Sequence, residues 1–141
     1  MKKAFLILVL FLLHMPNGIC APEIIIEAKQ AESAVIQLRG TLELKTFYGP
    51  PNFGEEPDTD AKETYYFLNL DRPMDVRETS GKAFRHVKSL QIVYADGRIT
   101  SIAGIDTTKK VFVTGKLFLA ETGHHHSDVL ILAEKISNVS K

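Results

Sequence analysis

The sequence has one cysteine and no tryptophan among its 141 residues. A single thiol excludes a framework of internal disulfides and a cysteine-rich zinc site. The chain has no excess of either charge, with 17 lysine and arginine residues against 17 aspartate and glutamate residues. Because a general nucleic-acid-binding domain normally carries a strong basic excess, we predict no nucleic-acid partner.

The chain also lacks the usual short motifs of catalysis. It has no Gly-x-Ser-x-Gly elbow of a hydrolase and no glycine-rich phosphate-binding motif. Its length suits one domain, and its 45% hydrophobic and 24% charged residues are typical of a globular chain. We therefore expect one folded domain that is not an enzyme.

The first twenty residues have the features of a secretory signal peptide. Lys2 and Lys3 precede an apolar run from Ala4 to Leu13, and Pro16 interrupts the segment that follows. Such a peptide has a charged start and an apolar stretch of about 7–15 residues. A membrane-spanning helix needs about 20 apolar residues. We predict export to the bacterial periplasm or to the outside, with no membrane span after the signal is removed.

Small residues place the expected cleavage between Cys20 and Ala21. Cleavage there leaves a mature chain without cysteine, which suits an oxidising compartment. The alternative is a lipoprotein anchored through Cys20. The bulky Ile19 directly before that cysteine disfavours it, because a glycine or alanine is expected there.

The expected organisation is a signal peptide over residues 1–20, a lead-in over 21–32, a barrel domain over 33–137 and a tail over 138–141. The lead-in includes an extra edge strand over Ile24–Gln30. Alternating apolar and polar residues predict two further strands, Ala34–Phe47 and Lys110–Ala120. Apolar and aromatic residues predict three more, Thr64–Leu70 with Met74–Val76 as its continuation, Val87–Tyr94 and Asp128–Ile136.

Two of these strands share the spacing apolar-x-apolar-x-Gly-x-Leu-x-Leu, with Gly40 and Gly115 at the same position. A glycine within a strand often marks a bend at a barrel corner. In the first of these strands the alternation predicts a core-facing set that ends with Leu42 and Leu44. Between the second and third strands, Arg77–His86 is predicted to be a polar loop.

The segment over residues 96–104 has two interpretations. Asp96-Gly97 favours a tight hairpin turn, whereas Ile99, Ile102 and Ala103 have helical spacing. We expect the short helix, because it gives the order of an OB-fold. The predicted fold is therefore all-β, an OB-fold-like five-stranded Greek-key barrel with one short helix between its third and fourth strands.

Four segments resemble a known family. Gly40–Leu44 with Tyr48–Phe53, and Val111–Leu117 with Thr122–His126, are similar to the secreted bacterial family catalogued as domain of unknown function 4431. The resemblance spans roughly residues 33–136. It implies an OB-like secreted domain and carries no activity.

Two loops hold the residues that look least like core filling. One loop, Tyr48–Lys62, joins the first two barrel strands, and the other, Glu121–Ser127, joins the last two. In an OB barrel these connections flank the usual ligand face, so we predict that they lie side by side. The candidate ligand-binding residues are Tyr48, Pro50, Pro51, Asn52, Phe53, His124, His125 and His126. Prolines restrict the backbone, so we expect the first loop to be stiff.

The three histidines have three possible roles. They can pack on Tyr48 or Phe53, they can contact a ligand, or they can bind a metal. In an extended segment His124 and His126 point to one side and can share zinc, copper or nickel, with a third ligand from Glu121, Asp128 or an acid of the first loop. We expect no other cofactor.

The function predicted from these features is an exported OB-fold binding module. It would contact a protein, peptide or cell-envelope ligand through the two loops, and one version is an inhibitor or immunity-type protein. The alternative is a periplasmic metal-binding protein that uses His124 and His126. A small hydrolase acting on envelope material is a third hypothesis.

Overall fold

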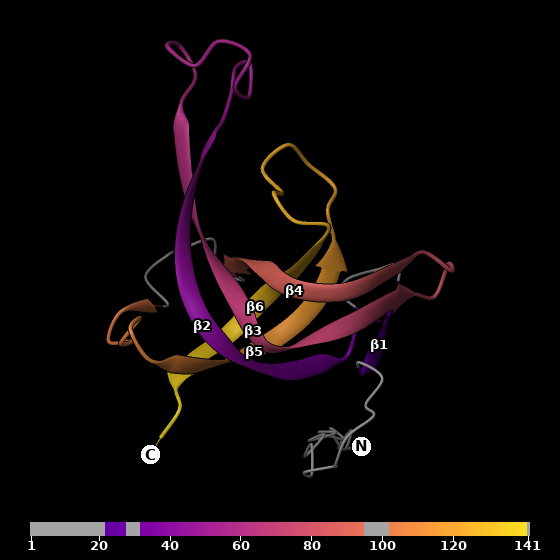
Figure 1. Ribbon diagram of the computed structural model, residues 1–141. Coiled ribbons are helices and arrows are strands. Elements are labelled where there is room, and N and C mark those ends of the chain that lie inside the picture. The colour runs from indigo at the N-terminus through magenta and orange to yellow at the C-terminus, as the bar shows by residue number, and fades with distance from the viewer. Residues whose placement is uncertain (1–21, 28–31, 95–101, 141) are drawn as a thin grey trace, which may run out of the picture.

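The computed structural model describes residues 22–27, 32–94 and 102–140, which form six strands and, within those ranges, no α-helix (Figure 1). The predicted signal peptide and Cys20 lie outside the described residues. No described helix is long and apolar enough to cross a membrane. The strands are β1 (Glu23–Ile26), β2 (Val35–Tyr48), β3 (Lys62–Glu78), β4 (Ala83–Tyr94), β5 (Lys110–Leu119) and β6 (Val129–Asn138).

Five of the strands close a barrel. β2 pairs antiparallel with both β3 and β5, β3 pairs antiparallel with β4, and β5 pairs antiparallel with β6. A parallel pairing between β4 and β6 completes the ring. The result confirms the predicted all-β, OB-fold-like Greek-key barrel. The predicted extra edge strand is also present, because β1 pairs in parallel with the second half of β3.

The short helix expected between β4 and β5 is not seen. Residues 95–101, including Asp96 and Gly97, lie outside the described residues. Where the description resumes, the backbone N–H of Ile105 donates to the carbonyl of Ile102 at 3.0 Å and closes a turn.

The polar loop predicted over Arg77–His86 is wrong. β3 and β4 continue through most of that segment, which leaves a short hairpin between Glu78 and Ala83. Charged side chains are accommodated here because they pair across strands. Arg85 lies 2.6 Å from Asp75, and Arg77 lies 2.8 Å from Glu23 of β1. The charged residues Arg77 and Arg85 of this segment therefore belong to strands joined by salt bridges and not to a loop.

The hydrophobic core fills the barrel interior, where facing positions of neighbouring strands meet. Leu68 of β3 pairs with Leu90 of β4, and both are fully buried. The other fully buried aliphatic and methionine side chains in the core are Met74, Val76, Ile92, Val111, Val113, Leu117, Val129 and Ile131. Burying such side chains contributes roughly 1.5–3 kcal/mol each.

β2 and β3 extend beyond the barrel as a two-stranded arm, which we define as Leu44–Tyr48 and Lys62–Tyr66 (Figure 1). The pairing of β2 with β5 ends at Thr41, and the pairing of β3 with β4 starts at Phe67. The prediction that Leu44 faces the core is wrong for this reason. Leu42 packs against the core, whereas Leu44 is 56% exposed.

The two glycines with shared spacing allow close contact between strands. A Cβ at Gly40 would lie 2.0 Å from the carbonyl oxygen of Asn69, and one at Gly115 would lie 2.0 Å from that of Leu132. The register of β5 and β6 also shifts next to Gly115. The glycines therefore stand where only a hydrogen side chain fits, in agreement with their predicted place at barrel bends.

Candidate functional site

A row of buried side chains lies on the outer face of the barrel. Phe67 pairs with Gln91, Gln91 pairs with Leu130, and Leu130 pairs with Phe118. Paired residues share a face of the sheet. All four are buried although none belongs to the core cluster inside the barrel. The connection between β5 and β6, residues 120–128, is called the histidine loop (Figure 1). It contacts this row at Gln91 and Phe118.

Gln91 holds the histidine loop on the barrel. Its side chain is 1% exposed. Its Nε2 donates to the backbone carbonyl of His124 at 2.9 Å, and its Oε1 accepts from the backbone N–H of His126 at 2.6 Å. The backbone N–H of Gln91 donates to Oγ of Ser127 at 3.0 Å. Buried polar groups need such partners, so this one amide fixes both sides of the histidine turn.

The rings of the three histidines point to different partners. Nδ1 of His124 lies 2.8 Å from Oε2 of Glu63 on the arm. Nδ1 of His125 accepts from the backbone N–H of Glu121 at 2.9 Å, inside the loop itself. His126 stacks flat on Phe47, with ring centroids 3.9 Å apart and 1° between the planes.

The arm and the histidine loop shift each other's pKa values. The hydrogen bond with His124 lowers the pKa of Glu63, and burial opposes this shift only in part. Burial and the hydrogen bond to Glu63 raise the pKa of Tyr65 to about 12. Burial lowers the pKa of His126, whose Nε2 has no hydrogen-bond partner among the described residues. Burial also lowers the pKa of His125.

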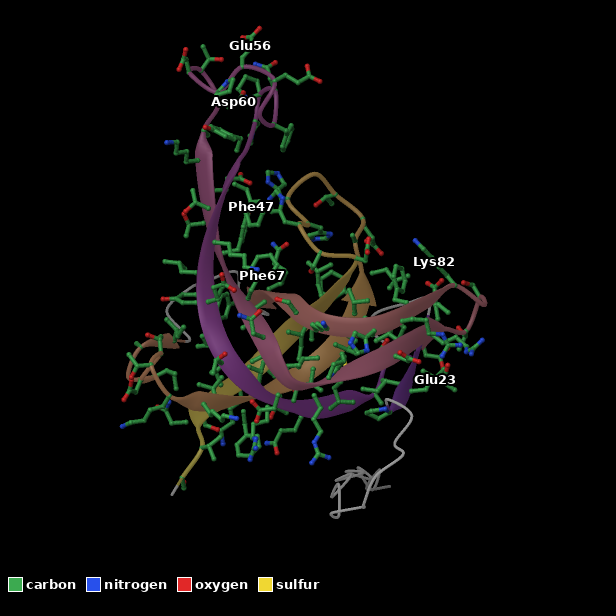
Figure 2. All side chains as sticks on the ribbon, in the orientation of Figure 1. Glu23, Phe47, Glu56, Asp60, Phe67 and Lys82 are labelled. Atoms are coloured by element: carbon green, nitrogen blue, oxygen red, sulfur yellow. The ribbon has the colours of Figure 1, made fainter. Side chains whose placement is uncertain are left out.

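The far end of the arm, residues 49–61, is a tight loop held by a buried carboxylate; we call it the arm tip. Asp60 accepts from the backbone N–H of Asn52 at 2.8 Å and from that of Gly54 at 2.7 Å. Burial raises the pKa of Asp60, but these hydrogen bonds outweigh it and the net shift is downward. Figure 2 shows Glu56 and Asp60 at this end, far along the arm from Phe67.

Phe53 links the arm tip to the histidine loop. Its backbone has a φ of 52°, and Gly54 follows with a φ of 102°, so the chain reverses here. The ring of Phe53 meets that of His124 edge-on at 5.9 Å. A Cβ on Gly123 would lie only 3.1 Å from Cε1 of Phe53. The predicted meeting of the two loops is therefore present in the structure.

An open groove of about 420 Å³ lies where the loops meet. Most of its lining residues have aromatic rings, and Tyr48 and Phe53 remain 40% and 47% exposed. The groove is lined by Thr46, Phe47, Tyr48, Phe53, Gly123 and His126.

Of the predicted site residues, Tyr48, Phe53 and His126 line the groove, and His124 contacts Phe53. The other four are placed elsewhere: Pro50, Pro51 and Asn52 form the arm tip, and His125 packs on Phe118 at 5.5 Å. The peptide bond between the two prolines is cis. Of the two expected packing partners, Phe53 meets His124. The flat stack on His126 is made by Phe47, which was not expected.

Sequence reasoning missed three positions that shape the site. Phe47 was predicted only as the end of a strand, and Gln91 only as one residue of an apolar strand. Glu63 fell between the predicted loop, which ended at Lys62, and the predicted strand, which began at Thr64. The amide of Gln91 between Leu90 and Ile92 was the available signal, because a buried amide needs partners.

The histidines are not arranged as a metal site of three or more ligands. Across the described ranges, no group of three histidine, cysteine, aspartate or glutamate side chains could hold a metal ion. His124 and His126 have separate neighbours on the arm, Glu63 and Phe47.

Part of this site is similar to a known family. The family described as a domain of unknown function (DUF4431) matches residues 102–137. That segment comprises β5, the histidine loop and nearly all of β6, so it includes one wall of the groove. No curated protein and no solved structure matches the chain. The DUF4431 description names no activity, ligand or partner.

Proposed function

We propose that this protein is an exported binding module without enzymatic activity, which holds a protein, peptide or envelope ligand in the groove between the arm and the histidine loop. An inhibitor or immunity-type role is one form of this function. The observation that carries the proposal is the groove itself, with exposed Tyr48 and Phe53 on its rim. Aromatic side chains in such positions commonly supply much of the energy of binding.

The walls of the groove are preorganised, which favours binding. Gln91 fixes the histidine loop, and Asp60 fixes the turn that presents Phe53. A ligand then orders few additional groups, so less conformational entropy is lost on association. Export is supported by the charged and apolar character of residues 1–20.

The test is recovery of a ligand from an envelope extract of the source bacterium. Residues 21–141 would be immobilised as wild type, as Tyr48→Ala/Phe53→Ala and as Ile25→Ala. Ile25 is the matched control, since it is an exposed hydrophobic residue on β1, 61% accessible and outside the groove. We expect wild type and Ile25→Ala to retain the same ligand and the double variant to lose it. Equal recovery by all three proteins would overturn the proposal.

A further inference from the structure

One backbone edge of the arm has no partner strand among the described residues. β3 pairs with β2 as far as Tyr48, but β5 pairs with β2 only from Val35 to Thr41. In the part of the chain that the structure describes, no strand lies against this edge of β2 beyond Thr41. An edge of this kind presents unpaired N–H and C=O groups to another extended chain.

The hydrogen-bonding pattern shows which groups point outward. The backbone N–H of Gly49 donates to the carbonyl of Ala61 at 2.7 Å, and the antiparallel register continues from there to Gly40 without a shift. Bonding to one neighbour alternates along an antiparallel strand. Leu44, Thr46 and Tyr48 therefore direct their N–H and C=O groups to the open edge.

The groove runs along the same edge. Consecutive residues of β2, Thr46, Phe47 and Tyr48, all line it, although their side chains alternate between the two faces of the arm. The same three residues and Lys62 line a second hollow of about 220 Å³. A groove lined by an unbroken run of one strand follows its backbone, which suits an extended ligand.

The side chains beside the edge define the ligand further. On one face Leu44 and Tyr48 are exposed, and on the other Phe47 and Phe53 border the groove. A strand added here would bring apolar residues to both faces. The arm tip exposes three acids, Glu55, Glu56 and Asp58, and they outnumber the one lysine at its base, Lys62. A basic residue of the ligand is therefore favoured at that end.

We propose that the ligand is an extended, apolar peptide segment of a partner protein, which adds to β2 at Leu44–Tyr48 as an antiparallel strand with a lysine or arginine at its N-terminal end. This proposal rests on the proposed function and names the class of ligand.

The added strand continues the line and direction of β5. The residues before β5 turn away, since Lys109 donates its backbone N–H to the carbonyl of Asp106. Because β2 runs toward the arm tip, the N-terminus of an antiparallel peptide meets the acids. Main-chain hydrogen bonds give affinity in this mode, and alternate side chains give specificity.

The experiment is an NMR titration of ¹⁵N-labelled protein, residues 21–141, with synthetic peptides up to millimolar concentration. The probe is Lys-Lys-Thr-Val-Thr-Val-Thr-Val-Thr. One control peptide has every threonine and valine N-methylated, so that the N–H groups facing β2 are removed in either register of the alternating ladder. Another has two glutamates in place of the lysines. The edge-blocking variant is Thr46→Pro, which removes an outward N–H. Its matched control, Thr46→Val, keeps that N–H. Phe53→Ala tests the groove separately.

We expect saturable shifts centred on Leu44, Thr46 and Tyr48 with the lysine probe. N-methylation and Thr46→Pro should each weaken binding at least tenfold, the glutamate peptide should bind several-fold more weakly, and Thr46→Val should change affinity less than twofold. If Thr46→Pro is unfolded by its NMR spectrum, the N-methylated peptide alone decides.

Absence of saturable binding, or binding insensitive to N-methylation, would overturn the strand-addition proposal. Binding that ignores Thr46→Pro and is lost in Phe53→Ala would overturn it while supporting the groove as a binding site. The recovery experiment with envelope extract judges the proposed function independently of either result.

Discussion

Replacing Gln91 with leucine removes the amide that fixes the histidine loop while nearly preserving its volume. The side chain makes one hydrogen bond to the carbonyl of His124 and one to the N–H of His126, and it is 1% exposed. The leucine leaves both backbone groups without this partner. An unsatisfied buried donor or acceptor costs about 1–3 kcal/mol, so we expect a loss of about 2–5 kcal/mol.

Such a loss is a large share of the total for a domain of this size, since folded domains are stable by about 5–15 kcal/mol. The assay is urea-induced unfolding followed by far-ultraviolet circular dichroism and tyrosine fluorescence, because the chain has four tyrosines and no tryptophan. The midpoint should fall without a large change in the slope. NMR spectra of the same variant should show shifted amide signals for the histidine loop.

The control is the same chemical change at an exposed site. Gln37 of β2 is exposed and donates only a long hydrogen bond of 3.4 Å to Thr114. We expect Gln37→Leu to change the free energy of unfolding by no more than about 0.5 kcal/mol. If Gln91→Leu is as stable as Gln37→Leu, the reasoning that one amide holds the loop on the barrel is refuted.

Three further outcomes follow from the same contacts. Gly115→Ala should lower the free energy of unfolding by at least about 2 kcal/mol, because its Cβ would lie 2.0 Å from a carbonyl oxygen of β6. In the control Gly81→Ala the new Cβ meets no atom, so the positive φ alone should lower the free energy of unfolding, by only about 1 kcal/mol. Equal urea midpoints for the two variants would contradict this. Since burial lowers the pKa of His126, the unfolded state binds protons more readily near pH ~6.5, and the free energy of unfolding should decline as the pH falls from about 7 toward 5. His126→Phe should reduce the decline of the free energy of unfolding with falling pH, which urea titrations at several pH values measure. The same pH dependence in His126→Phe and in wild type would contradict the reasoning. Untagged protein dialysed against buffer should retain no stoichiometric zinc, copper or nickel by elemental analysis. Metal retained by wild type but lost in His124→Ala/His126→Ala would contradict this prediction.

The barrel could be predicted because each core strand has its own sequence pattern. Alternation identifies β2 and β5, and the order of elements identifies the closed ring. Alternation cannot show where a strand leaves the barrel. Leu44 was therefore assigned to the core, although the pairing of β2 with β5 ends at Thr41 and Leu44 is exposed. Composition also failed for the β3–β4 hairpin. Its charged residues belong to strands, where Asp75 and Glu23 form ion pairs with Arg85 and Arg77.

The candidate site could be predicted in part, from topology. In an OB-like barrel the two loops meet, and the contact of Phe53 with His124 bears this out. The partners of the histidines could not be predicted, since they depend on β3 and β4. Glu63 and Gln91 lie 61 and 33 residues from His124 in the chain. Nothing local in the triplet indicates which ring meets which partner.

Three successive histidines in one turn do not form one chemical unit here. His124 reaches the arm carboxylate of Glu63, His125 bonds back to its own loop, and His126 lies flat on Phe47. Two of these contacts tie the loop to the arm, and they do so on the face that borders the groove. The arm therefore does not depend on its own two strands alone for its position. A two-stranded ribbon is only marginally stable by itself, so the contacts of the histidine loop with Glu63 and Phe47 help to hold the arm in place.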